Sequence, residues 1–129
     1  MTNILAIAAA GALGTLARYG LSGLAHQWLG ARFAWGTLAV NLLGCLVLGV
    51  LMQLALTTDA VPQPWRLPLA IGFCGAFTTF STFGYETLRF VEDGAWGLAV
   101  GNVAANVVGG LALTWLGFVA ARAMTGGAM

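Results

Sequence analysis

Charged side chains are scarce in this sequence of 129 residues, of which only 7% are charged, and lysine does not occur at all. The formal net charge is +1, and the five arginines lie singly along the chain. Binding to nucleic acid needs a clustered basic surface, so the sequence argues against such a partner. Soluble domains carry about 25% charged residues. Because 60% of this chain is hydrophobic, we expect its solvent to be a lipid bilayer.

The residue types that build catalytic and metal centres are also few. The chain has one histidine and two cysteines, Cys45 and Cys74, and these three lie far apart in the sequence. That spacing does not make a zinc site. A disulfide between the cysteines is possible, but small apolar residues at helix interfaces are favoured. No nucleophile–base constellation is visible, so we predict that the protein is not an enzyme.

Long apolar stretches, by contrast, fill the chain. The charged residues divide it into four of them, at residues 3–25, 33–56, 66–90 and 94–121. Each exceeds the ~20 residues that a helix needs to cross about 30 Å of hydrocarbon. The first lacks the basic start of a signal peptide, so we interpret it as a spanning helix. The sequence therefore predicts an all-α membrane protein with one four-helix domain, residues 1–129.

The distribution of arginine leaves the orientation of these spans open. Arg66 and Arg122 fall on the side of the N-terminus and the second loop, and Arg32 and Arg89 fall on the other. Arg18 joins the latter if its side chain snorkels. So small a bias does not fix a direction. One hypothesis is insertion both ways and pairing with an inverted copy; the other is a single orientation set by helix hydrophobicity.

Polar side chains recur inside the spans at helical spacing. Two such stripes are Thr37, Asn41, Cys45, Gly49 and Gln53 in the second span, and Asn102, Asn106, Gly110 and Thr114 in the fourth. In lipid, small and polar residues hold helices together, which favours an interface for the glycines and Cys45. For Asn41 and Asn106, an interface and an ion pathway are both open, because a buried amide either finds a partner or lines water.

Two ionisable groups lie within the spans, Arg18 and Glu86. Such groups usually mark a functional site that faces the protein interior. Both also lie near the end of a span, so their long side chains could instead reach water.

The stretch GAFTTFSTFG, residues 75–84, predicts an interruption of the third span. Its threonines, serine and phenylalanines are mediocre helix formers, and glycines bracket them. Non-helical backbone survives at membrane depth only inside protein or beside a water-filled cavity. Such a break exposes carbonyls that suit a cation and N–H groups that suit an anion. The edges of the Phe80 and Phe83 rings are also weakly positive.

The motif GFCGAFTTFSTF, residues 72–83, closely resembles the signature of the Fluc, or CrcB-type, fluoride channels of bacteria. WGTLAVNLLG at residues 35–44, GTLARY around Arg18, and Glu86 after the motif agree with that resemblance. It implies a channel in the bacterial inner membrane that exports cytoplasmic fluoride passively. It also implies an antiparallel, dual-topology homodimer with two pores. A central structural sodium ion (Na+) would be held there by the backbone carbonyls of Gly75 and Thr78.

The resemblance further assigns the pore. Narrow pores must replace the water of a small, tightly hydrated anion with close donors. The implied contacts are Asn41 and the ring edges of Phe80 and Phe83, with a polar track of Thr79, Ser81, Thr82 and Asn106. Together with Thr37, Glu86 and Arg18, these residues form the predicted ion pathway. Arg18 would raise the local anion concentration near an entrance.

Other functions are weaker alternatives. A small proton-coupled multidrug exporter is also a four-span dual-topology dimer, but it needs an acid deep in the membrane. The first span has none, and Glu86 lies near a span end. A purely structural subunit would leave the TTFSTF stretch unexplained.

Overall fold

The structure, a computed structural model, describes residues 2–127, and every element of secondary structure in that range is helical. The elements are α1 (Thr2–Leu29), α2 (Trp35–Thr57), α3 (Gln63–Leu67), η1 (Pro68–Cys74), α4 (Gly75–Phe77), α5 (Phe80–Glu92) and α6 (Trp96–Met124). By length and composition, four helical segments could cross a membrane: Asn3–Leu29, Trp35–Thr57, Gln63–Glu92 and Trp96–Met124. The all-helical architecture with four long apolar segments is thus confirmed.

The third of these segments is bent and interrupted. It starts with α3, continues as the π-helix η1 and the short α4, and restarts as α5. Between α4 and α5 the backbone is extended, with φ −94° and ψ 162° at Thr78 and φ −151° and ψ 114° at Thr79. The interruption lies between Gly75 and Gly84, as the sequence indicates, but Gly75 itself is helical at φ −63° and ψ −38°. The π-helical turn was not apparent from the sequence.

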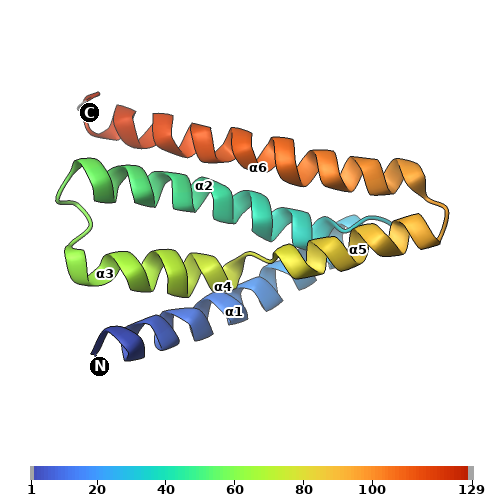
Figure 1. Ribbon diagram of the computed structural model, residues 1–129, viewed down its shortest axis with the longest axis horizontal. Helices are drawn as coiled ribbons and strands as arrows, with labels where there is room; N and C mark the ends of the chain where they lie inside the picture. The colour runs from blue at the N-terminus through green and yellow to red at the C-terminus, as the bar shows by residue number, and fades with distance from the viewer. Residues whose placement is uncertain (1, 128–129) are drawn as a thin grey trace.

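The helices form an elongated bundle in which α1 is set at an angle to the rest (Figure 1). Helices α2 and α6 run side by side, and the interrupted segment lies along α2. The N-terminus, the α2–α3 loop and the C-terminus share one end of the bundle. Helix α1 extends to Leu29, beyond residue 25 where the first span was predicted to end, so His26 is helical.

The contact between α2 and α6 depends on close backbone approach. A methyl group added at Gly49 would overlap the Thr114 carbonyl, and one at Gly117 would lie 2.6 Å from the Leu46 carbonyl. Small residues of this kind are what allow helices to pack tightly in lipid. The prediction of an interface at Gly49 agrees with this packing.

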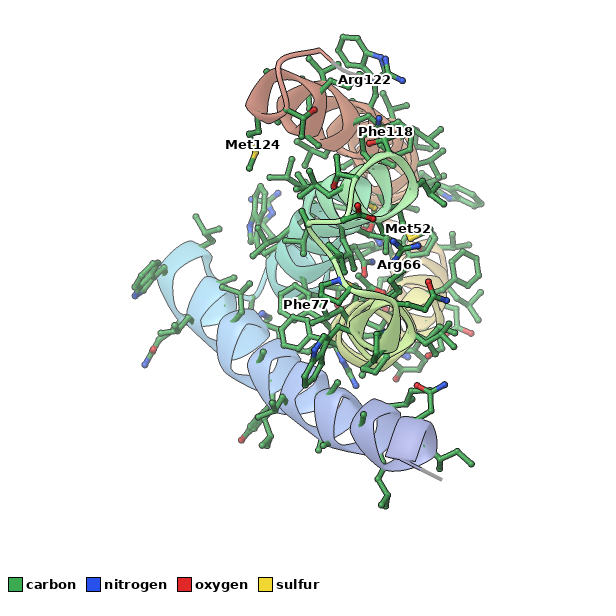
Figure 2. All side chains as sticks on the ribbon, turned by 90° about the vertical axis from the view of Figure 1, so that its left-hand side faces the viewer. Met52, Arg66, Phe77, Phe118, Arg122 and Met124 are labelled. Carbon is green, nitrogen blue, oxygen red and sulfur yellow. The ribbon has the colours of Figure 1, made fainter. Side chains whose placement is uncertain are left out.

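Helix α1 is the most exposed of the four long segments and packs against η1, α2 and α4, most extensively against η1. Figure 2, which views the bundle from its left-hand end, shows α1 apart from the other helices, with Phe77 beside it. Phe77 is buried and its ring stacks on that of Phe73, at 5.8 Å between centroids. The half of the third segment before the interruption is therefore anchored on α1, whereas α5 contacts α6.

Candidate functional site

At the interruption, the side chain of Asn41, on α2, forms hydrogen bonds with the backbone of Thr79. Its Oδ1 accepts the N–H of Thr79 at 2.8 Å, and its Nδ2 donates to the Thr79 carbonyl at 3.1 Å. The same Nδ2 donates to Oδ1 of Asn106, on α6, at 2.9 Å. The N–H of Thr79, which has no backbone acceptor at the interruption, is thus paired by a side chain, and this lowers the penalty for breaking a helix in lipid.

The interruption also releases backbone carbonyls. In a continuous helix the N–H of Thr79 would donate to Gly75, and that of Thr82 would donate to Thr78. The first donates instead to Asn41, and the second donates to Oγ1 of Thr79 at 3.3 Å. The carbonyls of Gly75 and Thr78 therefore lose their helical donors, and these are the two carbonyls predicted to hold sodium. Oxygen ligands of this kind suit a hard cation.

The side chain of Arg18, on α1, also contacts the backbone next to the interruption. Its Nε donates to the carbonyl of Ala76 at 3.0 Å, at the end of α4. A cation at the carboxyl end of a helix is stabilised by the carbonyl dipoles there. In this chain Arg18 thus fastens α1 to the interruption and brings positive charge to it.

Thr79 caps the amino end of α5. Its Oγ1 accepts the Thr82 N–H and donates to Oγ1 of Thr82 at 3.0 Å, while Ser81 lies 3.5 Å away. Threonine is a favoured cap because it satisfies one of the free N–H groups in the first turn. The amino end of a 13-residue helix also favours a nearby anion.

A cleft of about 320 Å³ opens beside the interruption. Five of the predicted pathway residues line it: Asn41, Thr79, Phe80, Phe83 and Asn106. The rings of Phe80 and Phe83 lie 5.5 Å apart and are tilted by 55°. Phe83 is 9% exposed, but Phe80 is 82% exposed and lies on the outer surface of the single chain. We call this the amide cleft.

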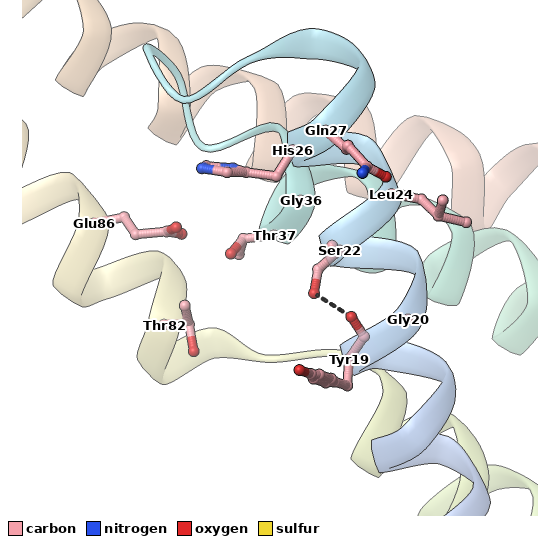
Figure 3. A pocket seen from close by; sticks show the side chains of 11 residues that line it. Tyr19, Gly20, Ser22, Leu24, His26, Gln27, Gly36, Thr37, Thr82 and Glu86 are labelled. Carbon is pink, nitrogen blue, oxygen red and sulfur yellow. Dashed lines mark hydrogen bonds between the residues drawn. The ribbon is translucent and has the colours of Figure 1, made fainter.

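A second and wider cleft, of about 880 Å³, lies between α1, α2 and α5. Figure 3 shows the side chains of Thr37, Thr82, Glu86 and His26 reaching into it. Oε1 of Glu86 is buried and has no hydrogen-bond partner within the described residues. We call this cleft the vestibule, because its lining includes three predicted pathway residues, Thr37, Thr82 and Glu86.

The predicted pathway residues thus fall into two adjoining groups. Thr79 connects them, because it lines the amide cleft and donates to Thr82 in the vestibule. On α2, Thr37 in the vestibule lies one turn from Asn41 in the amide cleft. Ser81 and Arg18 line neither cleft, although both lie next to the interruption.

The amide groups continue away from the cleft in a chain that the sequence does not reveal. Nδ2 of Asn106 donates to Oδ1 of Asn102 at 3.1 Å, and Nδ2 of Asn102 donates to Oγ1 of Thr87 at 2.9 Å. Asn102 is fully buried. The four-residue spacing of Asn102 and Asn106 was visible in the sequence. Thr87 gave no signal, because its place opposite Asn102 depends on how α5 packs on α6.

Comparison with known proteins places this architecture in a family. Residues 5–118 match the family described as CrcB-like protein, Camphor Resistance (CrcB). A protein of Geobacter sulfurreducens named Fluoride-specific ion channel FluC is 52% identical over 122 residues, covering 95% of this chain and 98% of that protein. Proteins of the same name from Geobacter metallireducens and from Dehalococcoides mccartyi are 50% and 49% identical, covering 95% and 91% of this chain and 98% and 90% of their own lengths.

These relatives are named as ion channels, and ion conduction is not an enzymatic reaction. The prediction that the chain is not an enzyme is confirmed on that basis. With four apolar helices long enough to cross a membrane, it is a multi-pass membrane protein.

Proposed function

Because the chain belongs to the CrcB-like protein family, we propose that it is a fluoride channel that lets fluoride leave the cytoplasm passively across the inner membrane of a bacterium. The single observation that carries this proposal is the interrupted third segment, whose amino-terminal helix end, hydroxyls and phenyl rings gather beside two clefts, one on either side of Thr79 and Thr82. A small anion is stabilised by that combination of donors and positive ring edges.

The proposed route runs from the vestibule, past the amino end of α5, into the amide cleft. The hydroxyl of Thr37 has no acceptor among the described residues, and that of Thr82 accepts from Thr79 and keeps its own proton free. Both are therefore available to donate to fluoride in the vestibule. The donors of Asn41 are already paired, so fluoride at this depth would have to replace one of its acceptors.

We also propose that two inverted copies assemble around their interruptions. Gly75 and Phe80 are exposed on the single chain, beside carbonyls that have lost their helical donors. Lipid cannot satisfy such backbone groups, so they require cover by protein. A second copy of this chain would supply that cover and bury Phe80, and each copy would keep its own clefts.

Sodium fits the centre of such a dimer. The carbonyls of Gly75 and Thr78 from both copies would supply oxygen ligands, and the ion would balance the carbonyl dipoles that face one another. Its contribution would be to stabilise the interruption. The conducting residues of the clefts would remain those named above.

An efflux measurement tests the proposed function. Purified protein is reconstituted into liposomes loaded with potassium fluoride, valinomycin is added, and external fluoride is followed with an electrode. A parallel sample is loaded with chloride. Rapid release of fluoride without release of chloride is expected. A folded preparation that releases neither ion, or both equally, contradicts the proposal.

The antiparallel dimer has its own test. Ala60→Cys, in the loop between α2 and α3, is introduced into a chain in which Cys45 and Cys74 are changed to alanine. A membrane-impermeant maleimide is then added to sealed spheroplasts. Labelling of about half of the molecules is expected, because insertion in both directions exposes the loop equally on both sides. Labelling of all or none indicates a single orientation.

The proton-coupled exporter has no comparable support. None of the relatives named above is called an exporter. The membrane acid that it needs would have to be Glu86, which lies on the wide vestibule rather than in a central substrate cavity.

A further inference from the structure

Beyond the residues of the two clefts, we propose that Thr87 and Asn102 are positioning residues, which orient the amides of Asn106 and Asn41 through a one-way chain of hydrogen bonds. This inference rests on the proposed function, because it concerns the same pathway. Neither residue lines the vestibule or the amide cleft. They act only through the amides that contact the interruption.

The chain of hydrogen bonds starts at a backbone N–H, which can only donate, and ends at a backbone carbonyl, which can only accept. At one end the N–H of Thr79, which can only donate, bonds to Oδ1 of Asn41. At the other end the carbonyl of Phe83, which can only accept, receives the hydroxyl of Thr87 at 2.8 Å. A hydroxyl that has given its proton to a carbonyl can only accept from its other neighbours. Thr87 must therefore receive a proton from Asn102.

This constraint propagates through the amides. Because Nδ2 of Asn102 donates to Thr87, its Oδ1 is left facing Asn106 and accepts from it. Nδ2 of Asn106 also donates to the backbone carbonyl of Asn102 at 2.9 Å, so its Oδ1 is left facing Nδ2 of Asn41. Every amide donates in the same direction, from α2 through α6 to α5.

The direction decides whether the contact between α2 and α6 is attractive. If Asn106 were turned over, its Nδ2 would face the Nδ2 of Asn41, and two donors would meet without an acceptor. Asn102 is completely buried, so water cannot replace a missing partner there. Thr87 thus fixes the amide of Asn102, whose Oδ1 then reinforces the orientation of Asn106, and the Oδ1 of Asn106 is the acceptor that fluoride would have to displace from Asn41.

Removal of the Thr87 hydroxyl tests the relay. For Thr87→Val we expect the maximal fluoride efflux rate to fall about five- to tenfold, the size expected for one buried hydrogen bond. Thr87→Ser keeps the hydroxyl and should stay within about twofold of the unchanged protein. The readout is the liposome efflux assay, after each variant has been shown to elute as the unchanged protein does. If Thr87→Val does not fold, Thr87→Ala removes the same hydroxyl.

Thr57 provides a matched control. Its hydroxyl donates to the carbonyl four residues earlier, Gln53, as Thr87 donates to Phe83, but it belongs to no chain of amides. Thr57→Val should therefore leave efflux unchanged. In the background of Asn102→Leu, adding Thr87→Val should cause no further loss, because the link through which it acts is gone.

Two outcomes would overturn the relay: equal losses in Thr57→Val and Thr87→Val, or a full additional loss in the double variant. An unchanged protein that releases no fluoride would instead contradict the proposed function, so the two failures are distinguishable.

Discussion

Two segments of the chain combine glycines with polar side chains, yet only one is interrupted. The polar side chains are amides and a hydroxyl in the continuous α6, and mainly hydroxyls in the interrupted segment from η1 to α5. In α6, Thr114 donates to the carbonyl of Gly110 and Asn106 to that of Asn102, so these side chains add to the hydrogen bonds of an intact helix even where Asn106 also reaches α2. At Thr79, side chains replace the hydrogen bonds of the backbone instead. What the polar groups bind, rather than glycine content, determines where the helix stops.

Glycine has a different use in each segment. In α6, Gly117 lets the backbone of α2 approach, and the helix around it stays regular. In the interrupted segment, Gly75 is helical and exposed, which leaves its freed carbonyl uncovered by any side chain of its own. In α6 the absence of a side chain at glycine allows close packing of α2, whereas in the interrupted segment it leaves a backbone oxygen accessible.

The largest expected effect comes from removing the partner of the interruption. Asn41→Asp keeps an acceptor for the Thr79 N–H but loses the donors to the Thr79 carbonyl and to Asn106. With two partly buried hydrogen bonds lost and a negative charge added at membrane depth, fluoride efflux should fall more than about a hundredfold. The liposome assay measures this. Efflux within about threefold of the unchanged protein would show that fluoride conduction does not depend on Asn41.

Replacing different glycines of α6 with alanine should have different effects on stability. Gly117→Ala adds a methyl group against the backbone of Leu46 and Val50, and we expect a loss of about 1–3 kcal/mol of stability. Gly101→Ala meets no atom within 4 Å and should be neutral or slightly stabilising. The apparent Tm in detergent compares them. Equal Tm values would show that close approach at Gly117 is not what α6 needs.

Exposed aromatic residues offer a third comparison. Phe80 follows the interruption and is 82% exposed, and Trp115 on α6 is 62% exposed. If Phe80 contributes a positive ring edge to the pathway, Phe80→Ile should lower fluoride efflux about tenfold, an effect close to the upper end for one aromatic contact. Trp115→Ile should leave it unchanged. Similar losses in both variants would indicate a general effect on packing.

The smallest expected effect is on stability, from removing the side chain of Thr79 that caps α5. Thr79→Val removes the acceptor of the Thr82 N–H and should destabilise the protein by about 1 kcal/mol. Thr114→Val in α6 loses only a hydroxyl bonded to its own helix, and a change within about 0.5 kcal/mol is expected. The stability losses of the two variants are compared by thermal unfolding in the same detergent, monitored by circular dichroism. A larger loss for Thr114→Val would reverse the comparison.

Much of this fold could be predicted because lipid allows few alternatives. Long apolar stretches must be helical there, and charged residues mark their ends, so the four segments followed from the sequence. The interruption was indicated by the TTFSTF stretch for a similar reason: its side chains suit neither lipid nor a helix. The α1 boundary was less accurate, since His26 continues the helix to Leu29.

The rest required contacts between helices. Asn41 was predicted as a donor in the pore, and its pairing with the Thr79 peptide depends on how α2 lies against the interruption. The proposed role of Thr87 likewise depends on its hydrogen bond to Asn102, which the sequence does not reveal. The roles of the pathway residues and of sodium remain predictions until they are measured.

The most direct test is an experimental structure of the protein assembled in lipid with sodium and fluoride present. We expect two inverted copies whose interruptions meet, with the carbonyls of Gly75 and Thr78 from both copies around one cation, and with the N–H of Thr79 bonded to Asn41. A continuous third helix, in which the Thr79 N–H donates to Gly75, or a Gly75 carbonyl that faces lipid, would contradict this expectation.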